Sequence, residues 1–200
     1  DHCGYLPLLA HNGFAGKVYC SEGTRDLCRV LLPDAGRLQE EEAEYANRRG
    51  FSRHKPAKPL YTERDAKRAL ALLHPVDFGA RLDVQGVALT LLPGGHILGA
   101  SIASFELGDA RIVFSGDLGR LEDAVMAPPA RVRNADYLVV ESTYGNRRHD
   151  DADPLAKLAA AVRATVARGG VVLIPAFAVG RAQALLHFIH LLKDRGEISR

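Results

Sequence analysis

The sequence predicts an α/β protein built in layers. Apolar runs of strand length recur through the middle of the chain, and segments with apolar residues at helical spacing lie on both sides of them. The run at residues 137–140 is almost wholly apolar, which is typical of a strand covered on both faces. At about 150 residues per domain, 200 residues with 47% hydrophobic composition are enough for one to one and a half domains with a packed core.

The first part of the chain is predicted to pass from strand to helix. Its elements are a short strand at 17–20, a helix at 24–32 after a Ser/Thr start, a polar helix at 37–49 and a third helix at 64–73. A proline-containing loop at 51–59 lies between the last two helices and carries Arg53, His54, Lys55 and Lys58. Such a basic loop is most often a solvated surface.

The second part is predicted to begin with strands. These lie at 87–92, 101–107, 111–114 and 137–140, and a Gly108-Asp109 turn joins the second and third into a hairpin. Asp153-Pro154 predicts the start of a helix, and Gly169-Gly170 its end. An apolar run at 171–174 predicts a buried strand, which a helix at 181–193 would follow as a βα unit of parallel-sheet type.

The charge of the chain limits how it can bind a polyanion. Twenty-six Lys and Arg against 24 Asp and Glu give a net charge of +2, which excludes nucleic-acid binding by bulk charge alone. A phosphate partner must therefore be held at a local site, by a few cations, metals or helix N-termini.

The three cysteines, Cys3, Cys20 and Cys28, form no Cys-x-x-Cys pair and indicate neither a disulfide framework nor a cysteine zinc site. We therefore expect a reducing, cytoplasmic setting. The apolar runs are too short for a membrane span, so no membrane partner is expected. Residue 1 is aspartate and an apolar segment follows at once, so we also expect the chain to be a piece of a longer protein.

Three ionisable residues follow directly on predicted strands. They are His96, Asp117 and Glu141. Polar groups at strand ends converge on the crevice where open α/β sheets bind ligands, and the glycines around His96 and Asp117 allow close approach. Histidine with carboxylate is the ligand chemistry of zinc. Taken singly, each residue is more often structural: a histidine in a glycine turn, a common Ser-Gly-Asp-Leu-Gly turn, a glutamate that caps a helix.

Together the motifs are specific enough to name a family. The chain resembles the metallo-β-lactamase superfamily, and within it the β-CASP group of RNA-processing nucleases. The matching segments are Asp1-His2-Cys3-Gly4-Tyr5-Leu6-Pro7 for the end of the His-x-His-x-Asp-His signature, Gly95-His96-Ile97-Leu98-Gly99, Phe114-Ser115-Gly116-Asp117-Leu118-Gly119, Glu141-Ser142-Thr143-Tyr144-Gly145, and residues 174–183. The last two distinguish the β-CASP group.

The resemblance implies a role for each matching residue. Asp1 and His2 would ligate one zinc and His96 the other, while Asp117 would bridge the two Zn²⁺ ions. Asp1 would also hold or accept the proton of a bridging water, which two zinc ions activate as a hydroxide. Glu141 would orient a histidine from outside this chain, and the first two histidines of the signature would also lie outside it.

Arg181 is the candidate for substrate binding. It begins the last predicted helix, where the free N–H groups and the helix dipole favour an anion, so it is a candidate ligand of an RNA phosphate. The alternative is an ion pair that fixes the loop. His149 lies just after the Glu141 motif and is interpreted as a surface residue.

The resemblance implies a partial metallo-β-lactamase αββα sandwich at residues 1–146, lacking its N-terminal part, and the truncated start of an inserted β-CASP α/β domain at 147–200. The function expected is zinc-dependent hydrolysis of RNA, as an exo- or endoribonuclease, with DNA as an alternative substrate and the homo-oligomeric state left open.

Two rival functions remain. One is a hydrolase of a small ester, thioester or lactam, and the other is a metal-free scaffold subunit of an RNA-processing complex. The first would not need the motifs at 141–145 and 175–183, and the second usually loses ligands. The isolated 200-residue chain is expected to bind metal weakly and to be inactive.

Overall fold

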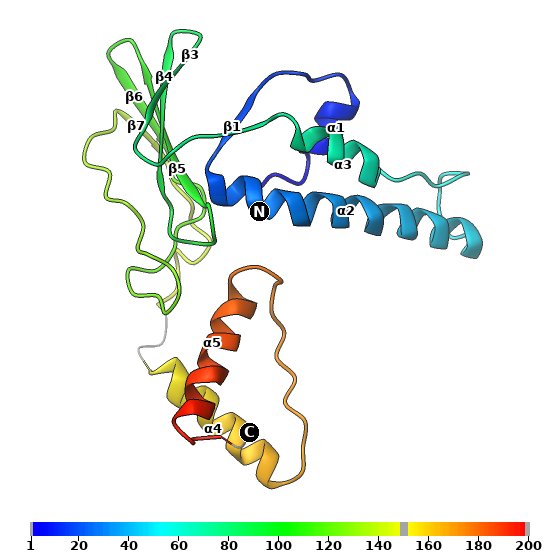
Figure 1. The fold of residues 1–200 in the computed structure, drawn as a ribbon, viewed down its shortest axis with the longest axis vertical. Helices are drawn as coiled ribbons and strands as arrows, with labels where there is room; N and C mark the ends of the chain where they lie inside the picture. Colours follow the sequence, from blue (N-terminus) through cyan, green and yellow to red (C-terminus); the bar gives the residue numbers. More distant parts are fainter. Residues whose placement is uncertain (1, 149–151, 199–200) are drawn as a thin grey trace.

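The computed structural model describes residues 2–148 and 152–198 and shows a mixed α/β chain (Figure 1). Helices dominate its first third, a five-stranded sheet its middle, and two helices its last part. In chain order the elements are α1 (Leu6–His11), β1 (Val18–Cys20), α2 (Glu22–Arg49), α3 (Glu63–Leu70), β2 (Leu73–Pro75), β3 (Arg81–Val84), β4 (Val87–Pro93), β5 (Ser101–Leu107), β6 (Ala110–Phe114), β7 (Tyr137–Val139), α4 (Pro154–Ala167) and α5 (Arg181–Asp194).

The two helices predicted at 24–32 and 37–49 are one helix, α2. It begins at Ser21, whose hydroxyl accepts a hydrogen bond from the Thr24 N–H, and ends at Gly50 with a left-handed backbone. Pro33 lies inside it and removes one hydrogen-bond donor, at a typical cost of about 3 kcal/mol. Buried residues on both sides of Pro33, from Cys28 to Ala46, pack the helix along its length and offset that cost.

The third helix is shorter than its predicted range of 64–73. It begins at Thr62 with a capping box to Asp65 and ends at Ala71. Leu73 lies instead in β2, which pairs in parallel with β1 so that Leu73 is opposite Val18. The helices and this small sheet enclose a core formed by Leu6, Cys20, Cys28, Leu32, Tyr61, Ala66, Ala69 and Leu73.

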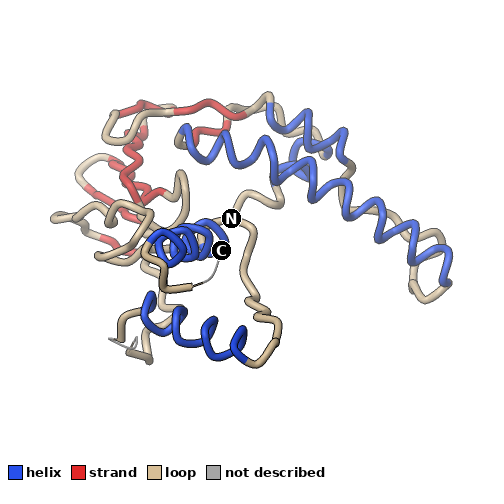
Figure 2. Tube along the Cα trace, turned by 60° about the horizontal axis from the view of Figure 1, so that its bottom comes forward, coloured by secondary structure: helices blue, strands red, loops and turns tan. Residues whose placement is uncertain are grey.

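The predicted strands of the middle region are present in one sheet. Its order is β3-β4-β5-β6-β7, antiparallel except for the parallel pair of β6 and β7. The expected hairpin forms between β5 and β6, with Leu107 opposite Ala110. Figure 2 shows this sheet at one end of α2, which extends away from it.

The expectation that residues 137–140 form a strand covered on both faces is wrong. β7 forms, but all three of its residues and Val140 are exposed. The reason is position: β7 is the edge of the sheet and pairs only with β6 among the described residues.

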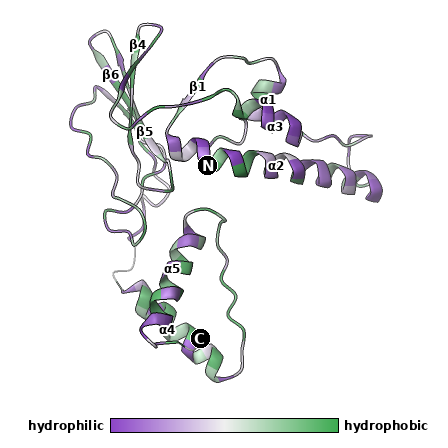
Figure 3. Cartoon of the chain, in the orientation of Figure 1, coloured by the Kyte–Doolittle hydropathy of each residue, from purple (hydrophilic) through white to green (hydrophobic). Residues whose placement is uncertain are grey.

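The buried strand predicted at 171–174 is also wrong, and with it the βα unit. These residues belong to no strand, and 87% of Leu173 is exposed. An extended segment becomes a strand only when it pairs with another strand, and no described strand pairs with residues 171–174. Figure 3 shows the apolar colouring of this connection between α4 and α5.

The two C-terminal helices agree with the prediction. α4 begins after Asp153, whose carboxylate accepts a hydrogen bond from the Leu155 N–H, and α5 begins at Arg181. Ala159 of α4 and Leu192 of α5 are fully buried. None of the helices in residues 2–148 and 152–198 combines the length and apolar content that crossing a membrane requires.

Candidate functional site

His96 lies in a tight loop between β4 and β5. The Gly94 N–H donates to the Ala100 carbonyl at 2.7 Å and closes the loop. Gly99 has a φ of 83°, and a Cβ there would lie 2.1 Å from the backbone nitrogen of Thr24. Because only glycine tolerates both conditions, the loop can touch the start of α2.

The carbonyl oxygen of Gly99 fixes the loop to α2. The hydroxyls of Ser21, Thr24 and Ser101 lie 2.7, 2.9 and 2.8 Å from it. Ser21 is buried, and all three hydrogen bonds are partly shielded from solvent. The N-terminus of α2 therefore holds the loop that carries His96.

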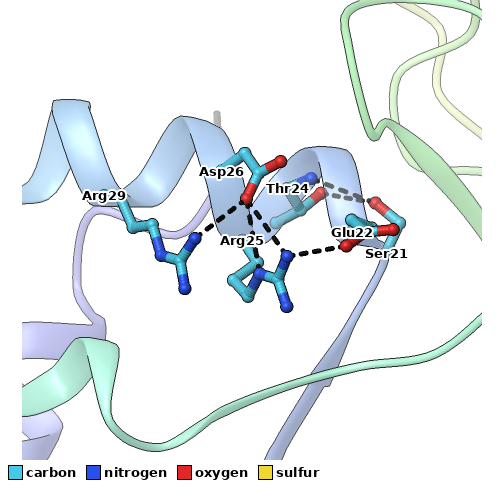
Figure 4. Close-up of polar contacts among 6 residues, drawn as sticks. All are labelled: Ser21, Glu22, Thr24, Arg25, Asp26 and Arg29. Carbon is cyan, nitrogen blue, oxygen red and sulfur yellow. Dashed lines mark hydrogen bonds and ion pairs between the residues drawn. The ribbon is translucent and has the colours of Figure 1, made fainter.

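Figure 4 shows the start of α2 with Ser21 and Thr24. The same turns carry an exposed ion-pair network in which Arg25 contacts Glu22 at 2.7 Å, while Arg25 and Arg29 each lie 3.3 Å from Asp26. Exposed pairs of this kind contribute little to stability, typically about 0–1 kcal/mol. The hydroxyl contacts to Gly99 are thus the structurally specific feature of this end of the helix.

Asp117 lies between two histidines. Its Oδ2 is 3.1 Å from His2 Nε2 and 3.8 Å from His96 Nε2. The loop of Asp117 is joined to that of His96 because the Gly119 N–H donates to the Gly94 carbonyl at 2.8 Å. A Cβ on Gly119 would lie 1.9 Å from the Gly95 carbonyl oxygen, so this approach requires glycine.

Glu141 follows β7 and braces the Asp117 loop. Its carboxylate accepts hydrogen bonds from the Leu118 N–H at 3.0 Å and the Thr143 N–H at 3.1 Å. Its own N–H donates to the Ser115 hydroxyl at 3.0 Å. The hydrogen bonds that the carboxylate accepts, first from Leu118 and then from Thr143, lower the pKa of Glu141. In the described chain Glu141 orients backbone next to Asp117.

The start of α5 reaches the same loops. A Cβ on Gly180 would lie 2.9 Å from Cγ2 of Ile97, the residue after His96. Arg181, the first residue of α5, is exposed at that point. Segments more than 80 residues apart in sequence thus meet, and the start of α5 contacts the loop that carries His96.

Two residues singled out from the sequence, Asp1 and His149, lie outside the described residues. The structure also adds supporting residues that sequence reasoning missed, namely Ser21, Thr24 and Ser115. The sequence indicated Ser21 and Thr24 as the start of a helix, but nothing in it predicted their hydrogen bonds to the Gly99 carbonyl.

His2, His96 and Asp117 supply imidazole nitrogen and carboxylate oxygen, which are zinc donors. Within residues 2–148 and 152–198, no three His, Cys, Asp or Glu side chains converge closely enough to hold an ion. The suitability of these residues for zinc therefore rests on two observations. Their donor atoms are of the right type, and Asp117 lies close to both histidines, as a ligand shared by two ions would.

Known proteins resemble this chain over nearly all of it, although no family model matches. It is 36% identical over 196 residues to transcription termination factor FttA of Methanocaldococcus jannaschii, with 93% of this chain and 28% of that protein covered. It is 33% identical over 189 residues to cleavage and polyadenylation specificity factor 73 of Drosophila melanogaster, with 93% and 26% covered. It is 31% identical over 191 residues to ribonuclease TTHA0252 of Thermus thermophilus, with 95% and 40% covered.

The chain thus spans between about a quarter and two fifths of the length of these relatives. A further relative, endoribonuclease ysh1 of Schizosaccharomyces pombe, is 33% identical over 192 residues. These matches cover 93–95% of this chain. The chain belongs to the β-CASP group of RNA-processing nucleases in the metallo-β-lactamase superfamily.

Proposed function

We propose that the full-length protein is a zinc-dependent nuclease that hydrolyses RNA phosphodiester bonds. The observation that carries this proposal is that one carboxylate oxygen of Asp117 lies close to both His2 and His96, which come from different segments of the chain. The ribonuclease and endoribonuclease names of two relatives support RNA as the substrate. Within this proposal residues 1–146 are part of an αββα sandwich, and 147–200 begin a second, β-CASP domain.

Asp1, His2, His96 and Asp117 would hold the metal. Two zinc ions there would polarise the scissile phosphate and lower the pKa of the attacking water. Asp117 suits the shared position because a carboxylate offsets positive charge on both sides. His2 and His96 would coordinate as neutral imidazoles. The hydrogen bond from the Gly119 N–H to the Gly94 carbonyl joins the loop of His96 to that of Asp117.

The remaining residues position the substrate and the loops. Glu141 fixes the backbone that carries Asp117 through its bond from Leu118. Arg181 binds a phosphate of the RNA, because its cationic side chain adds to the free N–H groups at the start of α5. With Ile97 against Gly180, that phosphate would lie near the scissile bond.

The test uses the full-length protein. Metal content is measured by elemental analysis and cleavage is followed on a labelled single-stranded RNA, for wild type, Asp117→Ala and the hairpin-tip control Asp109→Ala. About two zinc ions per chain, with cleavage lost only in Asp117→Ala, is the expected result. Metal without cleavage of RNA or DNA would instead indicate a hydrolase of small substrates, and absence of metal would indicate a scaffold.

A further inference from the structure

A basic surface lies at the end of α2 that is remote from the candidate site. Residues 45–60, which we call the α2 tip, contain Arg48, Arg49, Arg53, Lys55 and Lys58 and no acidic residue. All five of these cations are exposed. The chain as a whole has a net charge of only +2, so this stretch is a local concentration of positive charge.

The α2 tip is held in a defined shape by side chains of α2. The Asn47 amide donates to the Ala57 carbonyl at 2.9 Å and accepts from the Ala57 N–H at 2.7 Å. Further along, the Leu60 N–H donates to Gln39 at 3.1 Å. The loop is therefore fixed back onto the helix, and its cations are presented together.

Two exposed aromatic rings accompany the cations. Tyr45 and Phe51 lie with ring centroids 5.9 Å apart, and the Arg49 guanidinium lies 5.6 Å from the Tyr45 ring centroid. Phe51 is 64% exposed although it is fully apolar. An open aromatic face beside cations is the arrangement on which single-stranded nucleic acids stack their bases.

The acidic residues that precede the α2 tip are largely engaged elsewhere. Glu40 accepts a hydrogen bond from the Glu63 N–H at 3.0 Å, and Glu41 pairs with Arg37. Glu44 lies 3.7 Å from Arg48 and offsets the charge at that end of α2, and Glu42 lies three residues before the α2 tip. Arg53, Lys55 and Lys58 form no ion pair within residues 2–148 and 152–198, so the loop keeps its charge.

We propose that the α2 tip is an accessory site for single-stranded RNA, which binds the strand beyond the bond that is cleaved. This inference rests on the proposed function for the identity of the polymer. Phosphates would contact Arg53, Lys55 and Lys58, and a base would stack on Phe51.

The geometry sets the length of RNA that reaches both sites. The first turn of α2 contacts the His96 loop through Gly99, and the α2 tip is at its other end. Twenty-eight residues at 1.5 Å each make the helix about 42 Å long. At about 3.4 Å per stacked nucleotide, a strand of roughly a dozen nucleotides spans that distance.

The experiment compares a 6-nucleotide and a 30-nucleotide single-stranded RNA on the full-length protein, by fluorescence anisotropy across a salt series. The variant Arg53→Gln/Lys55→Gln/Lys58→Gln should bind the long RNA about tenfold or more weakly and leave the short RNA unchanged. The slope of log affinity against log salt for the long RNA should become less steep by about 2, because each of the three cations removed accounts for about 0.7. Phe51→Ala should weaken long-RNA binding about tenfold with an unchanged slope.

The matched control is Arg29→Gln/Lys67→Gln/Arg68→Gln, which removes the same charge from exposed positions of α2 and α3 outside the tip. If the tip variant and this control bind the long RNA with the same affinity, the inference is wrong. That result is also the one expected if the α2 tip binds a protein instead of RNA. Equal losses on both RNA lengths also overturn it. Length-dependent binding without cleavage would refute the proposed nuclease and leave the accessory site standing, so the two failures are distinct.

Discussion

Similar apolar segments are buried to different extents in the part of the chain before residue 120 and in the part after residue 136. In the first, apolar side chains of α2 and β6 are covered where these elements pack: Leu32 is 3% exposed and Val113 is fully buried. In the second, the strand β7 and the run 171–177 leave theirs open, with 82% of Phe177 exposed. Both parts carry strand-like and helix-like patterns of comparable strength, so the pattern alone does not determine burial.

The difference lies in where the partners are. β4, β5 and β6 are consecutive and pair through short turns, so each finds its neighbour nearby in sequence. β7 pairs with β6 on one side only, and no described strand lies beside residues 171–174. The burial of a segment whose partners are distant in sequence therefore cannot be predicted from its local pattern.

The sharpest test of this comparison is a matched pair of leucines in the 200-residue chain. Leu32→Ala should lower the free energy of unfolding by about 2–5 kcal/mol, because it opens a cavity in the N-terminal core. Leu173→Ala should change it by less than about 0.5 kcal/mol, because the side chain is already in solvent. Urea unfolding measures both, and equal losses would contradict the contrast between the two regions.

Within the second region, Glu141 and Arg181 should contribute to catalysis in different ways in the full-length protein. Glu141→Gln weakens the support of the Asp117 loop and should lower kcat about 10- to 100-fold, with partial loss of metal. Arg181→Ala should instead raise KM about tenfold and leave metal content unchanged, because the proposed role of Arg181 is to bind a substrate phosphate and not the metal. Steady-state kinetics with elemental analysis separates the two, and a metal loss in Arg181→Ala would refute its assignment.

A smaller effect is expected at the cap of α3, within the first region. Hydrogen bonds from the Thr62 hydroxyl and N–H, and secondarily from His11, lower the pKa of Asp65 to about 2. A lowered pKa stabilises the folded state above the unfolded value near 3.8, and that stabilisation is lost as the pH falls toward 2. Asp65→Asn should therefore cost about 1–2 kcal/mol at pH 7.

The measurement is urea unfolding of the wild type and Asp65→Asn at pH 7, 5 and 3. The difference should shrink between pH 5 and pH 3, where the carboxylate of the unfolded chain becomes protonated. A difference that grows between pH 5 and pH 3 would contradict the role of the ionised carboxylate.

The smallest effect is expected where α2 meets the His96 loop. Thr24→Val keeps the shape of the side chain and removes one of three hydroxyls around the Gly99 carbonyl, a net loss of about 0.5–1.5 kcal/mol. We expect a several-fold weaker metal affinity in the full-length protein, because the loop moves more freely. Ser115→Ala is not an equivalent control, since it acts through Glu141; Thr90→Val, in the middle of β4, is the better reference.

Much of the fold followed from local patterns. The hairpin of β5 and β6, the start of α4 at Asp153 and that of α5 at Arg181 were all predicted from turn and cap residues. The positions of His96 and Asp117 after predicted strands also predicted that these two side chains lie near each other. Periodicity, glycine turns and caps act over a few residues, and the amino-acid sequence states them directly.

Other features required the tertiary structure. The sequence alone determined which segments prefer strand or helix and which residue types could form a site. Only the fold decided that α2 continues through Pro33, that Ser21 and Thr24 hold Gly99, and that β7 is an edge. The physical reason is that burial and hydrogen-bond partners depend on which segments meet in space, and segments far apart in sequence carry no local record of that meeting.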